Sequence, residues 1–497
     1  MTEELKTFHI KTFGCAMNIA DSERCRAILE SYGLKQTDKI EQADIIIFNT
    51  CSVRQKAEDR IYGLKPLFES LGHQKQKPIT VLTGCMAKRR LGKEDVKKNT
   101  QTQKTKATRE KEIKKQAPWI DIVIEIQEFP QIFERINVLL ENEGYATINI
   151  KEQQPFLDIQ RKSGKNITAG ITISHGCDHL CTYCIVPYSR GREENRNAQS
   201  IIKETCDAAK AGSKDIILLG QTVNRWINPD YLPDYINPNR IHTRIEKLNK
   251  ESLPISHKNK EIASDTVPKD FLQLLQILDT IEGNFWLSFM SSHPNYYTKE
   301  LIDFIAESVE NQGHLKPFIH LALQSGNDEI LKKMRRDHTI QEFIGKVEYI
   351  KSTIPEVSVT TDIIVGFPGE TEKQFEDTKR VCEQLKFDQI YISEYSQREG
   401  TGASFMEDDI EHETKARRKS ELNKILADTA ISNNRKLLNK RTSVLVHKKD
   451  TNDTYQGRTK HNKLIKIYST KSLTPDKFYQ AKITEATPWA LAGIIQT

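Results

Sequence analysis

The feature of this chain that most restricts its fold is a rhythm that repeats six times after residue 163. A short apolar strand pattern ends in polar or glycine residues, and a helical pattern such as DFLQLLQILDTIE or EKQFEDTKRVCEQLK follows. The predicted strands read ITISHG, DIILLGQ, FWLSFMSSHP, FIHLALQSG, VSVTTDIIVGFPGE and QIYISEYSQ. Alternating strands and helices predict a parallel sheet. Because a closed barrel of this kind has eight units, six units predict a partial (β/α)6 barrel with an open side.

The active site of such a barrel lies at the carboxyl ends of its strands. We therefore expect functional side chains where the six predicted strands end. The polar or glycine residues at these ends are His175, Gln221, Ser292 with His293, Gln324 with Ser325, Gly366 with Glu370, and Glu394.

The first of these strand ends runs into HGCDHLCTYC, which holds three cysteines at spacings of four and three: Cys177, Cys181 and Cys184 (the loop triad). A structural zinc site closes with four ligands, so zinc would need His175 or His179 as well. A cubane iron-sulfur cluster has four irons that are normally held by thiolates. Three thiolates leave one iron open to an exogenous ligand. The spacing favours a reactive [4Fe-4S] cluster, and the small zinc site stays as the alternative.

A second group of three cysteines is spread over the first 90 residues: Cys15, Cys51 and Cys85 (the edge triad). Each follows a predicted strand, in FHIKTFGC, ADIIIFNTC and PITVLTGC, and helix-like segments separate the strands. This alternation predicts a parallel α/β sheet, in which ligands gather beyond the carboxyl ends of the strands. We therefore expect the edge triad to form a second cluster site. Ordinary buried cysteines are the alternative.

The cysteine count indicates the compartment. Nine cysteines, an odd and clustered set in a large chain, are typical of metal binding or catalysis in a reducing environment. The other three, Cys25, Cys206 and Cys382, lie in helical patterns and are predicted to be buried structural residues. No run of 18 apolar residues occurs, and the start MTEELKTFHIK does not read as a signal peptide. We expect a soluble, cytoplasmic protein that contacts no membrane.

The C-terminal segment is strongly basic. Residues 411–497 hold 18 Lys or Arg and 8 Asp or Glu, a balance of +10, whereas the whole chain carries +6 and residues 1–410 therefore carry −4. A basic helical connector precedes five short strands in residues 442–497. These strands predict a small β-barrel, in which Tyr455 and Tyr468 suit RNA contacts. The charges expected along a phosphate backbone are Lys448, Lys449, Arg458, Lys460, Lys463 and Lys466. The alternative is a solubilising surface.

Eight blocks of the chain resemble the signature blocks of the radical SAM methylthiotransferases, in that family's order: TFGCAMNIADSE, FNTCSVRQKAEDRIYG, TGCMAKR, HGCDHLCTYCIVPYSRGRE, LLGQTVN, LQSGND, DIIVGFPGET and GRTKHNKLI. The likeness covers nearly the whole chain. It implies four parts: a methylthiotransferase N-terminal domain over residues 6–150, a radical SAM core over 163–410, the connector over 411–441, and a TRAM RNA-binding domain over 442–497.

The resemblance implies two [4Fe-4S] clusters and S-adenosylmethionine as cofactors. The loop triad matches the radical SAM cluster ligands, and the edge triad matches the ligands of an auxiliary cluster. Contacts to S-adenosylmethionine are expected from Gly220, Gln221, Gln324, Ser325 and Asp362. An adenine C2–H bond is strong and not acidic, so breaking it requires a radical rather than an acid or a base, and the protein mainly positions the cofactors.

The reaction implied by the resemblance is methylthiolation of C2 of N6-dimethylallyladenosine at position 37, next to the anticodon of tRNA. Threonylcarbamoyladenosine in tRNA and an aspartate of a ribosomal protein are the alternative substrates. The blocks CAMN, SVRQKAEDR and RRDHTIQEF favour the dimethylallyl branch. A non-catalytic iron-sulfur carrier or RNA-binding scaffold would need no open iron, so the loop triad argues against it. The implied partners are the tRNA anticodon stem-loop and a small reductant protein such as a flavodoxin or ferredoxin, and we expect a monomer.

Several positions depart from the family pattern. Ala322 and Asn327 stand where Pro and Ser are usual, and Glu125 stands where Gly is usual. Two polar, Lys-rich stretches, residues 91–116 and 225–268, have the character of insertions. Both are predicted to be surface loops or disordered segments. The second follows the strand that ends at Gln221, so it could reach over the rim of the active site and touch RNA.

Overall fold

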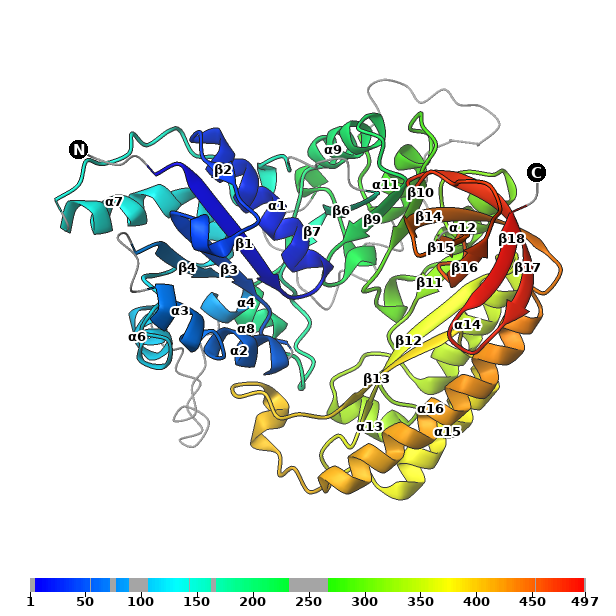
Figure 1. The fold of residues 1–497 in the computed structure, drawn as a ribbon. Helices are drawn as coiled ribbons and strands as arrows, with labels where there is room; N and C mark the ends of the chain where they lie inside the picture. Colours follow the sequence, from blue (N-terminus) through cyan, green and yellow to red (C-terminus); the bar gives the residue numbers. More distant parts are fainter. Residues whose placement is uncertain are drawn as a thin grey trace.

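The computed structural model describes residues 5–53, 55–71, 77–88, 106–142, 144–161, 167–231, 267–451 and 453–495. An N-terminal α/β part (blue to cyan in Figure 1) lies beside a central part of strands and helices (green to yellow), and a β-barrel (red) lies against the far side of that central part. Among the described residues, no helix is both long and apolar enough to cross a membrane.

The N-terminal part is a five-stranded sheet in which every pair of neighbouring strands is parallel, as the sequence predicts. Its strands, in spatial order, are β2 (Lys35–Gln36), β1 (Thr7–Phe13), β3 (Ile45–Thr50), β4 (Ile79–Thr83) and β5 (Ile122–Val123). All six residues of β3 are buried. Burial on both faces explains why this strand is an unbroken apolar run rather than an alternating one.

Helices cover both faces of this sheet. Ile45 and Ile47 of β3 pack in one core with α1 (Ala16–Ser31) and α7 (Ile132–Asn142). Ile46 and Phe48 pack in the opposite core with α2 (Gln55–Tyr62), α3 (Lys65–Leu71) and α6 (Lys106–Gln116). Side chains that alternate along a strand thus meet helices on each side. Cys25 of α1 is fully buried in the first core, as predicted.

The prediction of a loop for residues 91–116 is wrong for its last eleven residues, which form α6. Ile113 of this helix is buried against Phe48 and Trp119 in the second core. One apolar residue in a Lys-rich stretch leaves no visible periodicity, which is why the sequence pattern missed the helix. Residues 89–105 lie outside the described residues.

The central part contains the six predicted strands, all parallel and in sequence order. They form two sheets of three. Isolated parallel bridges Leu287–Leu315 and Ser292–Leu321 join β10 and the segment after it to the segments on either side of β11. This arrangement confirms a partial (β/α)6 barrel. The strands are β6 (Thr168–Thr172), β9 (Asp215–Leu219), β10 (Trp286–Phe289), β11 (Phe318–His320), β12 (Ser358–Val365) and β13 (Gln389–Glu394).

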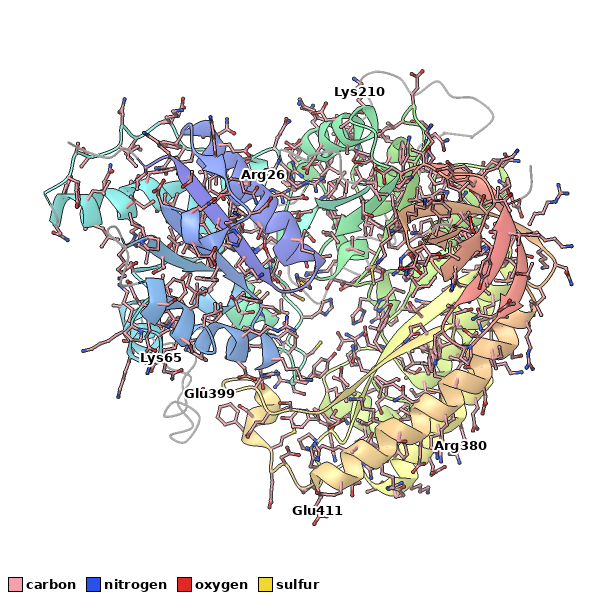
Figure 2. The ribbon with its side chains drawn as sticks, in the orientation of Figure 1. Arg26, Lys65, Lys210, Arg380, Glu399 and Glu411 are labelled. Atoms are coloured by element: carbon pink, nitrogen blue, oxygen red, sulfur yellow. The ribbon has the colours of Figure 1, made fainter. Side chains whose placement is uncertain are left out.

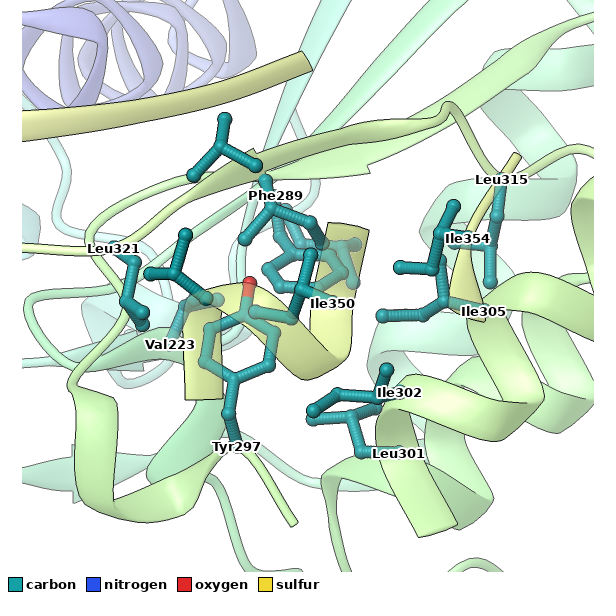
Figure 3. Close-up of a cluster of buried hydrophobic side chains, with 14 of the residues drawn as sticks. Val223, Phe289, Tyr297, Leu301, Ile302, Ile305, Leu315, Leu321, Ile350 and Ile354 are labelled. Carbon is teal, nitrogen blue, oxygen red and sulfur yellow. The ribbon is translucent and has the colours of Figure 1, made fainter. Parts of the chain in front are cut away.

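Helices α9 (Ala198–Lys210), α11 (Phe271–Leu278), α12 (Lys299–Glu310), α13 (Asp328–Lys333), α14 (Ile340–Thr353) and α15 (Glu372–Leu385) follow the strands. Figure 3 shows part of the core that they form with the strands, which includes Phe289, Tyr297, Ile305 and Ile350.

Exposed charges such as Lys65 of α3 and Arg380 of α15 lie on the outer surface (Figure 2). Cys382 is fully buried as predicted, whereas Cys206 is only partly buried.

The connector is a helix of 24 residues, α16 (His412–Arg435). It also belongs to the central core, because Leu422, Leu426 and Ala430 are buried there. In Figure 1 this helix runs alongside α15 to the C-terminal β-barrel. The barrel is closed in the order β14-β15-β16-β18-β17 and so confirms the predicted small β-barrel. Its strands are β14 (Arg441–Lys449), β15 (Thr454–Thr459), β16 (Leu464–Tyr468), β17 (Phe478–Ala486) and β18 (Leu491–Ile495).

The C-terminal barrel packs at the amino ends of the central strands. The ring of Trp286, the first residue of β10, lies 4.7 Å from that of Phe478 of β17. Lys463 Nζ lies 2.5 Å from the carboxylate of Asp388, which precedes β13. Since the cysteine loop follows the carboxyl end of β6, the barrel and the loop triad lie at opposite ends of the central strands.

The second stretch that resembled an insertion begins later than predicted. Trp226 is fully buried, and its Nε1–H donates to the carbonyl of Arg196 at 2.9 Å. Arg225 and Asn228 are buried as well. The first residues of the predicted loop therefore belong to the core that supports the strand end at Gln221. Residues 232–266 lie outside the described residues.

Candidate active site

The loop triad follows β7 (Ser174–His175) and is held by backbone hydrogen bonds. The N–H of Cys177 donates to the carbonyl of Gly191 at 3.1 Å, and the N–H of Cys184 donates to that of Cys181 at 3.0 Å. Gly176 has φ +73, and a Cβ there would lie 1.9 Å from the carbonyl oxygen of Arg192. Only glycine fits such a close approach with positive φ, so the glycine of HGC is required to shape the loop.

Burial dominates the electrostatics of the loop triad. It raises the pKa of Cys177 to about 11 and that of Cys184 to about 12. The free thiols of Cys177 and Cys184 therefore stay protonated near neutral pH, and binding of a soft metal centre would displace their protons. A positive charge lies beside the loop triad, because Arg336 Nη1 is 3.7 Å from the sulfur of Cys181. Three soft ligands with a partly buried guanidinium beside them fit an anionic iron-sulfur cluster.

Of the strand-end residues, Gly220 and Gln221 lie next to the loop triad. They follow β9 directly, and the hydroxyl of the adjacent Thr222 is 3.6 Å from the sulfur of Cys177. A Cβ on Gly220 would lie 2.5 Å from Ser174 Oγ, so this strand end also packs tightly against β7.

Gln324 and Asp362 are brought together by the backbone. The N–H of Gln324 donates to the carbonyl of Asp362 at 2.8 Å, and the carbonyl of Gln324 accepts from Ile364 at 2.9 Å. The carboxylate of Asp362 lies 3.2 Å from Nε2 of His320. Val359, Ile363 and Val365 of the same strand pack against the surrounding helices. Because side chains alternate along a strand, Asp362 lies on the opposite face of the sheet, toward the interior of the (β/α)6 barrel.

Ser325 follows Gln324 directly, but its side chain contacts the next helix instead. It is fully buried, and its hydroxyl accepts a hydrogen bond from the N–H of Asn327 at 3.4 Å. Asn327 is the N-cap of α13, and its side chain accepts from two backbone N–H groups of that helix. Asn caps a helix as well as Ser does, which accounts for this departure from the family pattern. At the other departure, Ala322 offers its carbonyl to Arg336 Nη2 at 3.1 Å.

The edge triad lies at the carboxyl ends of three adjacent strands. Cys15 is the N-cap of α1 after β1, Cys51 follows β3, and Cys85 begins α4 (Cys85–Lys88) after β4. The neighbouring thiol of Cys51 lowers the pKa of Cys85, whereas Cys85 and burial raise the pKa of Cys51. Cys15 is exposed, whereas Cys51 and Cys85 are buried. Cys51 and Cys85 are therefore near enough to shift each other's pKa, and Cys15 lies at the exposed side of the edge triad.

Two buried asparagines hold the strand ends that carry the edge triad. The amide of Asn18 donates to Asn49 Oδ1 at 2.9 Å, and the amide of Asn49 returns a bond to the carbonyl of Asn18 at 2.8 Å. Asn18 Oδ1 also accepts from the thiol of Cys15 at 3.4 Å. Gly84 has φ +88, and a Cβ there would lie 2.3 Å from Asn49 Oδ1. The network thus fixes the turns before Cys15 and Cys85.

Glu125, which stands where the family usually has Gly, forms an ion pair with Lys88. Its carboxylate is buried 3.4 Å from the ammonium of Lys88, at the end of the helix that Cys85 begins. Lys88 also donates to Gln127 Oε1 at 2.8 Å, and Gln127 lies 3.0 Å from His175 Nδ1.

In the described part of the chain, no three His, Cys, Asp or Glu side chains are placed to hold one metal ion.

Sequence reasoning did not find Thr222, Arg336 and Arg190, whose side chains contact cysteines of the two triads. Arg190 Nε donates to the sulfur of Cys85 at 3.1 Å. No spacing rule relates these residues to a cysteine. The one available signal is the resemblance: Arg190 and Thr222 lie in two of its eight blocks, HGCDHLCTYCIVPYSRGRE and LLGQTVN, and Arg336 lies in RRDHTIQEF, which favours the dimethylallyl branch.

The basic barrel differs in part from its prediction. Tyr455 is fully buried in the barrel core, and its hydroxyl accepts from the N–H of Leu473 at 3.0 Å, so the prediction of an RNA contact there is wrong. Lys460 and Lys463 bind the central part instead of facing outward, through Gly313 and Asp388. Tyr468 is 37 % exposed.

Comparisons with known proteins define the class. Residues 7–124 match a family described as "Uncharacterized protein family UPF0004", and residues 171–382 match the radical SAM superfamily. A solved structure, the radical S-adenosylmethionine methyltransferase TsrM from Kitasatospora setae, shares the fold at 12% identity and a TM-score of 0.51, over 80% of this chain and 77% of that one. The chain is a radical SAM enzyme.

Full-length relatives give the particular family. Three proteins called tRNA-2-methylthio-N(6)-dimethylallyladenosine synthase are each 34% identical to the chain. The match covers 98% of this chain and 92% of the relative from Thermoanaerobacter pseudethanolicus, 99% and 96% for Clostridium novyi, and 99% and 100% for Fusobacterium nucleatum subsp. nucleatum. The chain belongs to this family of radical SAM methylthiotransferases.

Proposed function

We propose that the chain methylthiolates C2 of N6-dimethylallyladenosine at position 37 of tRNA. The observation that carries this proposal is the pairing of two separate cysteine triads, one in the central barrel and one at the edge of the N-terminal sheet, with Arg190 contacting Cys85 of the second from the segment that follows the first. One site can generate a radical while the other supplies sulfur. The relatives' name points to the same substrate.

In this proposal the loop triad holds the [4Fe-4S] cluster that binds S-adenosylmethionine, and the edge triad holds the auxiliary [4Fe-4S] cluster. When bound, these cofactors supply the one-electron chemistry that an unactivated C2–H bond requires. The buried thiols and the guanidinium groups of Arg336 and Arg190 beside them support the assignment. The four parts of the chain are then 6–150, 163–410, 411–441 and 442–497.

The chain's own residues would bind and orient S-adenosylmethionine. Gly220 and Gln221 are suited to this role because Thr222, the next residue, contacts Cys177. Gln324, Ser325 and Asp362 end or line neighbouring strands of the same barrel, and backbone hydrogen bonds fix Gln324 against Asp362. Gln324 has φ +75, a conformation that turns the chain sharply at the strand end.

The tRNA anticodon stem-loop would bind the outer face of the C-terminal barrel. Strand register aligns three exposed residues across that face, because Lys448 pairs with Gln456 and Gln456 pairs with Lys466. Tyr468 pairs with the exposed Ile494 next to them, and Lys466 Nζ lies 5.3 Å from the centre of the Tyr468 ring. Cations around an exposed ring are suited to phosphate contact and base stacking.

The setting of the reaction follows from the same chemistry. All nine cysteines are free, which suits a reducing compartment such as the cytoplasm. We propose that the enzyme acts there as a monomer. Its electron would come from a small reductant protein such as a flavodoxin or ferredoxin, since one-electron cleavage of S-adenosylmethionine requires a donor.

The test uses full-length protein that has been reconstituted anaerobically with iron and sulfide and then supplied with S-adenosylmethionine and a reductant. Three substrates are compared: tRNA carrying N6-dimethylallyladenosine, tRNA carrying threonylcarbamoyladenosine, and the ribosomal protein with the candidate aspartate. Mass spectrometry should find the methylthio group only on the first. Modification of either of the others with the first untouched would overturn the proposal.

A further inference from the structure

Arg190 is placed to act on both cysteine triads. It ends helix α8 (Val186–Arg190), which begins two residues after Cys184 of the loop triad. Its side chain leaves the central part and reaches the N-terminal part, where Nε donates to the sulfur of Cys85 at 3.1 Å. A single side chain therefore connects the loop that holds one triad to a thiol of the other.

The Arg190 guanidinium is buried and only partly satisfied. Its Nη2 donates to the carboxylate of Asp21 at 2.9 Å, and the side chain is 2% exposed. Nη1 has no hydrogen-bond partner among the described residues. A buried N–H without a partner is costly, so an acceptor is expected at this position. A cluster sulfide beside Cys85 is an acceptor of the right charge.

Arg190 is also fixed with respect to the loop triad. The next residue, Gly191, accepts the N–H of Cys177 at 3.1 Å. The carbonyl of Arg190 accepts from Gln127 Nε2 at 3.0 Å, and Gln127 also lies 3.0 Å from Nδ1 of His175, two residues before Cys177. A shift of the loop triad would therefore move the guanidinium.

We propose that Arg190 is a positioning residue that joins the two sites: it holds the auxiliary cluster at a fixed offset from the radical SAM loop and stabilises negative charge on the sulfur atoms around Cys85. This inference rests on the assignment of the edge triad to an auxiliary cluster. A charge-assisted hydrogen bond to a ligand sulfur stabilises the more negative, reduced state of a cluster. Arg190 therefore raises the reduction potential of the auxiliary cluster.

The test measures the auxiliary cluster alone, in full-length protein whose loop triad is replaced by Ala. The fraction of reduced cluster is followed by electron paramagnetic resonance at a fixed poise at which the parent is half reduced. Arg190→Gln removes the charge and should lower the ratio of reduced to oxidised cluster about tenfold, which is about 59 mV for one electron. Asp21→Asn removes the opposing charge and should shift the ratio in the opposite direction.

Arg196→Gln is the matched control. Arg196 is an equally buried arginine that pairs with Glu204 and contacts no cysteine, so its loss should leave the ratio unchanged. Opposite shifts for Arg190→Gln and Asp21→Asn support a charge effect that simple loosening of the fold would not produce. An unchanged ratio in Asp21→Asn, or equal shifts in Arg190→Gln and Arg196→Gln, would overturn the inference. Iron content separates the two claims, since absence of iron from the parent would contradict the cluster assignment itself.

Discussion

Lys460 donates from Nζ to the carbonyl oxygen of Gly313 at 2.9 Å and so fastens the C-terminal barrel to the central part. Lys463 does the same through Asp388. Neither lysine is therefore available for phosphate unless the two parts separate. Of the six basic residues predicted to contact phosphate, Lys448, Lys449 and Lys466 are exposed.

Replacing Lys448, Lys449 and Lys466 together by Gln should weaken tRNA binding and its salt dependence. Each lost phosphate contact removes roughly 0.7 to 0.9 from the slope of log affinity against log salt, so loss of three contacts should flatten the slope by roughly 2 to 3. Binding measured at three salt concentrations gives the slope. The control triple Lys65→Gln, Lys77→Gln and Lys114→Gln removes equal charge from the N-terminal part, which lies on the other side of the central part from the C-terminal barrel, and it should not alter the slope. Equal effects of the two triples would indicate a merely solubilising surface.

Replacing the three cysteines of the loop triad by Ala should remove one cluster and all cleavage of S-adenosylmethionine. Iron per chain should fall from about eight to about four atoms, because each cluster holds four. Iron analysis and detection of 5′-deoxyadenosine after anaerobic reconstitution give both quantities. Parent protein that binds one zinc and little iron would instead support the zinc alternative.

Replacing the edge triad by Ala should separate radical formation from sulfur transfer. Cleavage of S-adenosylmethionine should persist, since Cys177, Cys181 and Cys184 are unchanged, whereas methylthiolated tRNA should disappear. Cys25→Ala is the control, because that cysteine is buried in the sheet core and belongs to neither triad. Formation of methylthiolated tRNA by the triple variant would disprove the role given to the edge triad.

Acid should destabilise the contact between the barrel and the central part through His461. Burial lowers its pKa to about 4, while the neighbouring Glu356 opposes that shift. Between pH 6.5 and 4 the unfolded chain binds a proton that the folded chain does not, so stability is complete above pH 6.5 and falls as the pH is lowered through this window. The loss can reach about 3 kcal/mol.

Urea unfolding at pH 5 and pH 8 measures this effect. His461→Gln should reduce the difference between the two pH values, because the variant has no imidazole to protonate there. His412→Gln is the control, since the side chain of His412 is 81% exposed. If both variants keep the parent's pH dependence, His461 does not cause it.

Strand positions could be predicted from the sequence because each strand is a short apolar run that ends in a turn. The edge triad could be predicted for the same reason, since Cys15, Cys51 and Cys85 follow three such runs. Contacts between residues far apart in the chain could not be predicted from such local patterns. Arg190 and Cys85 are 105 residues apart, and only the packing of two parts brings them together.

Tyr455 and Trp226 show a second limit of the sequence patterns. The basic character of its segment predicts that Tyr455 contacts RNA, yet its side chain faces the interior of the C-terminal barrel and its hydroxyl accepts from the N–H of Leu473. Trp226 stands at the start of a polar stretch, and its burial depends on Arg196, 30 residues away. Local composition describes the average of a segment and not the direction in which one side chain points.

The central claim concerns the nucleoside that is modified. Its most direct test is mass spectrometry of tRNA nucleosides from a strain that lacks this gene, with and without the gene restored. We predict that the mutant accumulates N6-dimethylallyladenosine without a methylthio group and that restoring the gene returns 2-methylthio-N6-dimethylallyladenosine. An unchanged amount of that nucleoside in the mutant, with loss of methylthiolated threonylcarbamoyladenosine instead, would contradict the account.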